Sequence, residues 1–287
     1  MNSTFANRDV LEFYKKLPFN FSSNLSQAAN DILSSRLDIL KYYVPIAEEL
    51  FLDDRIRVLE LGCGTGWLSI LLAHYYGCSV TGVDFNPVAI EQAGKLNEMV
   101  HPDKPSNPDF EVADLFLFDA PAFDIVISHG VLHHTDNCMQ GIRKACGLTK
   151  KQGHIIIGLY NRFGRKPFLD YFRSLKERNS NEEELFKAYR KLDERHGHDT
   201  TLARSWFYDQ VLHPHETQHT ITEVVEVFSE CGVKMIATSL DSYAAKPETD
   251  MQALLAKERK MYDAGVKAIE EGRYFTGYFV VVGEHTG

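Results

Sequence analysis

Residues 58–69, VLELGCGTGWLS, constrain the fold of this 287-residue chain most, because an apolar run breaks into glycines and then into a helical pattern. Gly62, Gly64 and Gly66 lack a Cβ, so they can adopt a positive φ and let a ligand approach the backbone. A helix beginning near Trp67 would point its free N–H groups at this turn. The segment therefore predicts a buried strand, a ligand-binding turn and a helix.

Strand and helix patterns alternate through the first half of the chain. Apolar runs predict strands at 57–61, 79–83, 109–113, 123–128 and 153–160. Helices are predicted between them at 67–76, 87–99 and 138–148. After a capping box, a helix is predicted at 224–231, followed by strands at 233–237 and 278–283 around a charged helix at 250–271. This alternation implies a single α/β domain over residues 1–287, with a parallel sheet between two helical layers.

Polar side chains stand at the ends of four predicted strands: Glu60, Asp84, Asp114 and His129. Ligands of parallel sheets bind at the carboxyl ends of the strands, so these groups are expected to gather at one site. Asp84 in this position can accept hydrogen bonds from both hydroxyls of a ribose. Each acid alone could instead cap a helix or a turn. Their order along the chain favours a shared ligand site.

These motifs resemble those of the class I S-adenosylmethionine (SAM)-dependent methyltransferases. The glycines follow G-x-G-x-G, whereas the dinucleotide fingerprint G-x-G-x-x-G would need a glycine at Trp67. The resemblance implies a seven-stranded doubly wound sheet whose last two strands form an antiparallel edge pair, with SAM as cofactor. It also implies that Glu60 and the glycine turn hold the amino acid end of SAM, Asp84 the ribose, and Asp114 and Leu115 the adenine. The predicted cofactor-binding residues are Glu60, Gly62, Cys63, Gly64, Gly66, Asp84, Phe85, Asp114, Leu115 and His129.

Two segments lie outside the alternating core. Residues 1–50 combine aromatics with Pro and Asn, and predict a helical flap over SAM or an arm anchored on the surface. Residues 161–219 are polar, aromatic and helix-prone, and they are too long for an ordinary connection. We expect them to form an α-helical insertion after the fifth strand that acts as a substrate lid. Residues 55–160 and 220–287 remain as the SAM-binding core.

Candidate acceptor-site residues come mainly from the insertion and the flap. Methyl transfer needs a base only when the acceptor atom carries a proton. The candidates for proton transfer are His133, Tyr160, Asp209, His213, His215 and His219. The candidates for substrate binding are Tyr14, Asn20, Asn161, Arg165, Trp206 and Glu216.

Several of these candidates have a second interpretation. The His133–His134 pair suits loop packing at least as well as chemistry, and Arg165 could pair with the acidic stretch 182–194. Three imidazoles at 213, 215 and 219 with Glu216 could hold zinc or iron. Their spacing is not diagnostic, so no metal is assigned.

Composition limits the remaining choices. A net charge of −9 disfavours a nucleic-acid partner, and five scattered cysteines without C-x-x-C spacing favour a reducing cytoplasm. No apolar run is long enough for a membrane span. The helix at 250–271 could cover its own sheet, the simpler choice, or a second subunit in a homodimer. The sequence predicts a SAM-dependent methyltransferase with a small-molecule acceptor. The alternatives are a protein methyltransferase and a non-catalytic SAM- or metal-binding module.

Overall fold

The computed structural model describes residues 8–34, 50, 55–103, 107–195, 197, 199–244 and 246–287. Its strands are β1 Arg57–Leu61, β2 Ser79–Asp84, β3 Asp109–Val112, β4 Phe123–His129, β5 Thr149–Tyr160, β6 Val233–Thr238 and β7 Tyr278–His285. The core helices are α5 Trp67–Tyr76, α6 Pro87–Val100, α7 Cys138–Gly147 and α11 Ile221–Glu230. Outside the core lie α1 Arg8–Lys16, α2 Leu25–Leu33, α8 Arg162–Glu177, α9 Glu182–Leu192, α10 Thr200–Phe207 and α12 Met251–Glu270.

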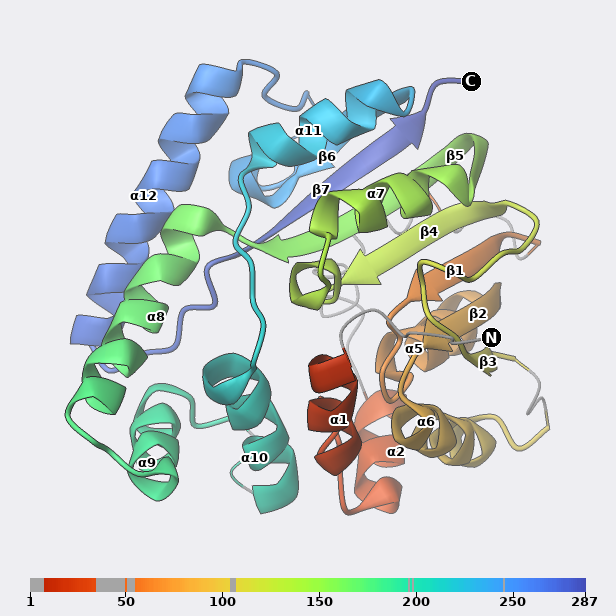
Figure 1. Ribbon diagram of the computed structural model, residues 1–287. Helices are drawn as coiled ribbons and strands as arrows, with labels where there is room; N and C mark the ends of the chain where they lie inside the picture. The colour runs from red at the N-terminus through yellow and green to blue at the C-terminus, as the bar shows by residue number, and fades with distance from the viewer. Residues whose placement is uncertain are drawn as a thin grey trace.

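The sheet has the predicted seven strands, in the order β3-β2-β1-β4-β5-β7-β6 (Figure 1). Strands β1 to β5 pair in parallel, and β7 runs antiparallel to both β5 and β6. The doubly wound sheet and its antiparallel edge pair are therefore confirmed. The fifth strand begins at Thr149 rather than at residue 153. Gln152, at φ +63°, interrupts the extended backbone there. Because of this interruption, the pattern of apolar residues does not show where the strand begins.

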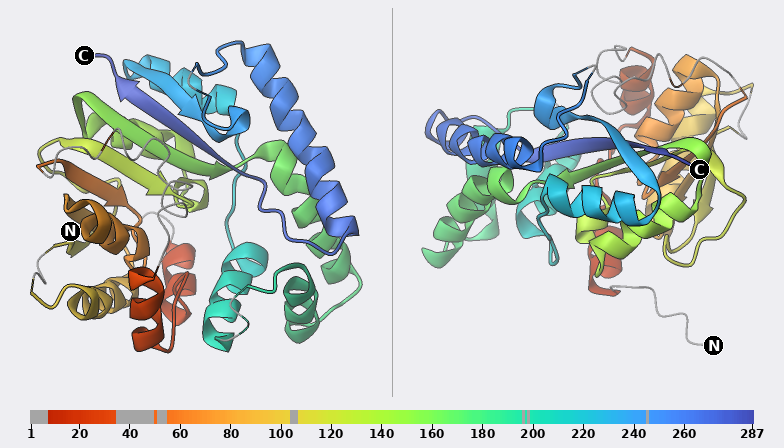
Figure 2. Two further views of the ribbon diagram at one scale, coloured as in Figure 1. Left: turned by 180° about the vertical axis from the view of Figure 1, so that it is seen from behind. Right: turned by 90° about the horizontal axis from the view of Figure 1, so that it is seen from above.

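Helices cover both faces of the sheet (Figure 2), and an apolar layer lies beneath them on each face. Side chains of α7 and α11 pack on alternate residues of the central strands, such as Leu59 and Val126. Side chains of α2, α5 and α6 pack on the opposite face, where Val58 and Ile125 point. This two-sided burial explains why the central strands read as continuous apolar runs.

The insertion after β5 consists of helices α8, α9 and α10 and has a small core of its own. Phe168, Phe172, Leu185, Tyr189 and Phe207 are buried there. Helix α12 runs alongside α8 and not across the sheet, in both ribbon figures. The expectation that α12 covers its own sheet is therefore wrong for most of its length.

Glycines explain the close contact between α12 and the insertion. A Cβ on Gly265 of α12 would lie 2.9 Å from Pro167 of α8, and one on Gly164 would lie 3.1 Å from Met261. Among the apolar positions of α12, Leu254 reaches the sheet core, whereas Tyr262 is exposed. The apolar face that suggested a second subunit is thus only partly covered within the chain.

The described part of the predicted flap contains α1 and α2, and residues 1–7 and 35–49 lie outside the described residues. The connection between the two helices reaches both the core and the insertion. Gln92 of α6 donates to the carbonyl of Ser22 at 2.8 Å, and the Ser22 hydroxyl donates to Asp199 before α10 at 2.9 Å. The flap therefore bridges the sheet and the insertion.

Candidate active site

A cavity of about 830 Å³ lies where the flap, the insertion and the carboxyl ends of the strands meet. One half is lined by the turns after β1, β2, β3 and β4, the other by aromatic residues of the flap, the insertion and the last strand. The predicted site residues that line it are Tyr14, Asn20, Glu60, Gly62, Cys63, Gly64, Asp84, Phe85, Asp114, Leu115, His129, Tyr160, Trp206 and Asp209. Residues from seven separate chain segments thus share one cavity.

The glycine turn takes the conformation that its sequence predicts. Gly62 and Gly64 have φ values of +78° and +52°, and a Cβ on Gly62 would lie 2.4 Å from the side chain of Val131. The N–H of Gly64 donates to Asp84 at 2.9 Å, so the carboxylate at the end of β2 fastens the turn. Gly66 does not line the cavity; it caps α5 at φ +78° beneath Phe110.

Glu60 is a buried acid that faces the cavity. Its side chain accepts a hydrogen bond of 2.5 Å from the Ser69 hydroxyl, and none of the described residues forms an ion pair with it. Burial raises the pKa of Glu60 to about 8, although the hydrogen bonds from Ser69 act in the opposite direction. Burial likewise raises the pKa of Asp84 to about 6. A ligand that carries an ammonium group would supply the positive charge that the carboxyl groups in this half of the cavity lack.

The opposite half of the cavity is aromatic. Phe19 of the flap and Trp206 of α10 pack with ring centroids 4.7 Å apart, and the Trp206 indole N–H donates to Asn20 at 3.2 Å. The rings that line this half are Tyr14, Phe19, Tyr160, Trp206, Tyr274 and Tyr278. Such walls fit a flat, largely apolar molecule and exclude water.

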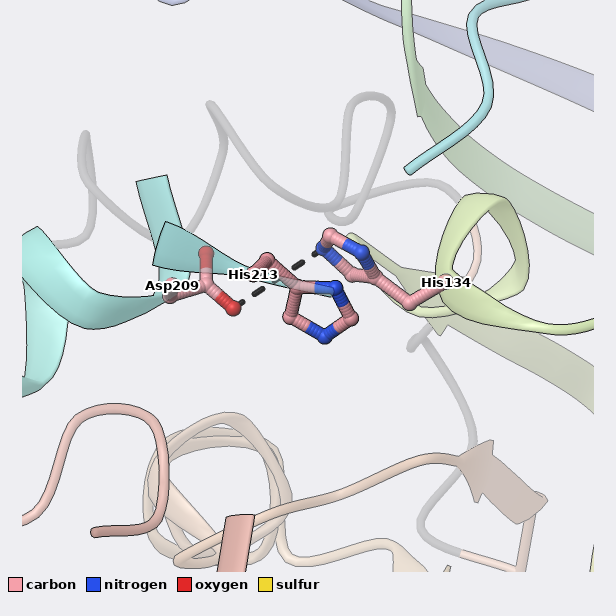
Figure 3. A group of neighbouring side chains, drawn as sticks. All are labelled: His134, Asp209 and His213. Carbon is pink, nitrogen blue, oxygen red and sulfur yellow. Dashed lines mark ion pairs between the residues drawn. The ribbon is translucent and has the colours of Figure 1, made fainter. Parts of the chain in front are cut away.

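A polar cluster borders the aromatic half. It consists of His134, Asp209 and His213, which Figure 3 shows, together with Tyr14. The Tyr14 hydroxyl donates to Asp209 Oδ1 at 2.5 Å, and His134 Nε2 lies 3.8 Å from the same oxygen. Burial lowers the pKa of His134 to about 4 and that of His213 to about 3. Both rings are therefore neutral near pH 7.

His134, Asp209 and His213 offer possible metal-ligand atoms that lie within 4.8 Å of one another. The two imidazole rings, however, lie nearly face to face, with centroids 3.8 Å apart and planes at 33°. Rings whose centroids are this close leave no room for an ion between their faces. His213 Nδ1 also accepts the backbone N–H of His215 at 3.1 Å. In this arrangement the three residues fit a metal poorly.

The metal set considered from the sequence is not brought together either. His215 Nε2 donates to the carbonyl of Thr135 at 3.0 Å, and His219 Nε2 lies 2.9 Å from the Thr217 hydroxyl. Neither of these two histidines lines the cavity. His213 is the one member of that set which reaches the polar cluster.

Three predicted substrate-binding residues are placed away from the cavity. Asn161 caps α8 and donates to Glu258 at 2.5 Å. Arg165, fully buried, forms two hydrogen bonds with Glu216, at 3.1 and 2.7 Å, and a third with the Gln210 side chain at 3.0 Å. These contacts use the groups that were expected to meet substrate, so the three side chains hold the insertion together.

His133 also differs from its expected role. It is completely buried, its ring lies 4.1 Å from that of Tyr160, and its Nδ1 faces the Tyr160 N–H at 3.4 Å. The neighbouring His134, which was weighed with His133 but not predicted as a site residue, lines the cavity instead. The two consecutive histidines indicated that this turn was a candidate for the site. The sequence could not show which of the two rings points toward the cavity.

Comparisons with known proteins agree with this geometry. A family profile described as a methyltransferase domain matches residues 52–276. A ubiquinone biosynthesis O-methyltransferase of Coxiella burnetii is 31% identical over 125 residues, which cover 43% of this chain and 50% of that protein. A 2-methyl-6-phytyl-1,4-hydroquinone methyltransferase of Synechocystis is 26% identical over 133 residues, 46% of this chain and 41% of that protein. The aligned part spans about half the length of these relatives or less.

Solved structures extend the likeness to the whole fold. Magnesium protoporphyrin IX methyltransferase from Synechocystis PCC 6803, crystallised with SAM, superposes with a TM-score of 0.53. It covers 99% of this chain and 100% of its own at 14% identity, which shows a shared fold.

The chain belongs to the methyltransferase-domain family, and its fold is that of the class I SAM-dependent methyltransferases. The matched domain takes in the described residues of the cavity from Glu60 to Tyr274. Its described helices include none with the length and apolar character needed to cross a membrane.

Proposed function

We propose that this chain is a SAM-dependent methyltransferase whose acceptor is a small, flat molecule that lies in the aromatic half of the cavity, between the flap and the insertion. The observation that carries the proposal is the continuity of one cavity of about 830 Å³ from the acidic half to the aromatic half. A cavity of this size suits a cofactor together with a compact acceptor. A protein substrate would instead need an open groove for a peptide.

The acidic half suits SAM in the orientation that the family motif implies. Glu60 would meet the ammonium, Asp84 the ribose hydroxyls, and Asp114 with Leu115 the adenine. The sulfonium methyl group would then point toward the aromatic half. Aromatic faces stabilise a nearby cation, and holding acceptor and methyl in line removes much of the entropic cost of a bimolecular reaction.

The names of the two relatives support an acceptor of this kind. One name refers to ubiquinone biosynthesis and the other to a hydroquinone, and quinones and hydroquinones are flat six-membered rings. The negative charge of the chain argues against nucleic acid as the acceptor. From these points we infer that the acceptor carries an aromatic hydroxyl.

A direct test is formation of S-adenosylhomocysteine (SAH) from SAM with a panel of catechols, hydroquinones and hydroxybenzoates. We expect SAH to form with at least one compound of this panel, through methylation of its ring hydroxyl. We expect no SAH when a denatured protein is offered as the acceptor. Trp206→Ala should raise the KM for the acceptor about tenfold or more, because a buried aromatic wall contributes about 1.5 kcal/mol or more, and should leave SAM affinity unchanged. Methylation of protein with no turnover of any small molecule would reverse the proposal.

A further inference from the structure

His134 lines the cavity, and one of its ring nitrogens has an unused lone pair. Its Nδ1 faces the carbonyl of His215 at 2.9 Å, and a carbonyl can only accept, so Nδ1 carries the proton. The neutral ring therefore has its lone pair on Nε2. That atom is buried and has no hydrogen-bond partner among the described residues. An acceptor without a partner, on a ring that lines a ligand cavity, is available to a donor group of a ligand.

Asp209 stands beside this lone pair and is itself fixed. Its two oxygens accept from the Tyr14 hydroxyl at 2.5 Å and from the Gln210 amide at 2.7 Å. Asp209 Oδ1 lies 3.8 Å from His134 Nε2, which is too far for a hydrogen bond but close enough to stabilise a charged imidazolium. The arrangement is that of a histidine base whose protonated form is stabilised by a carboxylate.

We propose that His134 is the catalytic base for an aromatic hydroxyl, with Asp209 as the group that stabilises its protonated form. The inference rests on the proposed function and deepens it. The acceptor O–H gives its proton to Nε2 while an oxygen lone pair forms the bond to the methyl carbon. The C–S bond breaks, and its electrons return to sulfur, which gives SAH.

The surroundings of His134 keep its lone pair free but disfavour the protonated ring, so a nearby carboxylate is needed to stabilise that form. Burial holds its pKa near 4, so the ring is uncharged at neutral pH. The charged and titratable groups packed around it are Tyr14, His133, Tyr160, Arg165, Asp209, His213, His215 and Glu216. His215 is a positioning residue, since its carbonyl sets the tautomer and its own ring is tied to Thr135.

The test compares two acceptors of different acidity in His134→Gln and in wild type. With catechol, whose hydroxyl is protonated at neutral pH, we expect kcat to fall about 10²–10⁴-fold in the variant, the usual contribution of a general base. With 4-nitrocatechol at a pH where it is already ionised, the two enzymes should differ by less than about threefold. His219→Gln, a histidine outside the cavity, should match wild type with both.

Four outcomes contradict the inference. An equal loss with both acceptors means that His134 has a structural role. If the wild-type protein methylates neither acceptor, aromatic hydroxyls are not its acceptors, and the proposed function is overturned together with the inference. Loss of wild-type activity in a chelator, with recovery on adding Zn²⁺ or Mg²⁺, means that the cluster holds a metal. If His134→Gln does not fold, Asp209→Asn takes its place, and an equal loss of kcat with both acceptors counts against the dyad.

Discussion

Glu60 makes the affinity for cofactor depend on pH in a direction that can be calculated. Its pKa is about 8 in the ligand-free protein, because burial disfavours the carboxylate. Binding of the amino acid end of SAM or SAH would place an ammonium against it and require the ionised form. A proton must therefore leave whenever the ligand binds below pH 8, and affinity must fall as the pH falls.

The size of the effect follows from the fraction of Glu60 that is protonated. With a pKa of about 8, the apparent Kd exceeds the intrinsic value about 11-fold at pH 7 and about 100-fold at pH 6, a change of about ninefold. Asp84, with a pKa of about 6, adds about twofold over the same interval. The ligand ammonium, with a pKa of about 7.7–8.0, stays protonated throughout.

Calorimetric titration with SAH at pH 6 and pH 7 measures both quantities. In buffers of different ionisation enthalpy, about 0.9 proton should be released per SAH at pH 7 from Glu60. Glu60→Gln is the matched control: it keeps an oxygen for Ser69, and its Kd should change only about twofold, through Asp84. A wild-type Kd that stays constant between pH 6 and 7, without proton release, would refute the placement of the ammonium at Glu60.

Three further predictions concern the turn and the insertion. Asp84→Ala should weaken SAH binding at least about tenfold with an unchanged circular dichroism spectrum, since a charged hydrogen bond contributes about 1.5–3 kcal/mol. Gly62→Ala should lower the free energy of unfolding by about 1–3 kcal/mol in thermal melts, because its Cβ would overlap Val131. Arg165→Met should cost about 3–5 kcal/mol in urea unfolding by leaving Glu216 buried and unpaired, and replacing Glu216 by Leu as well should restore most of it.

The core of the fold and the cofactor half of the site were predictable from the sequence because both depend on local signals. Alternating apolar runs set the strands, and the glycine turn with the acid at the end of each strand marks one edge of a parallel sheet. Glu60, Asp84 and Asp114 accordingly line one cavity. Their roles toward SAM stay predictions that the binding experiments test.

The acceptor half was less predictable because it depends on which way neighbouring side chains point. Asp209 and Gln210 follow one another in the turn Tyr208–Leu212, which has π-helical hydrogen bonding. Such turns deviate from the regular helical period, so no pattern indicates that one of these side chains meets Tyr14 and the other Arg165. The same problem applies to His133 and His134, which are adjacent but differ in their access to the cavity.

The buried pair of Arg165 and Glu216 is best understood through what it positions. A buried ion pair adds little net stability compared with apolar residues of similar size, so stability alone does not account for it. Arg165 also donates to both the side chain and the backbone carbonyl of Gln210, at 3.0 Å each. Gln210 in turn donates to Asp209, the residue that faces His134. The pair thus fixes both ends of the segment 209–216, and through it the carboxylate that a base at His134 would need.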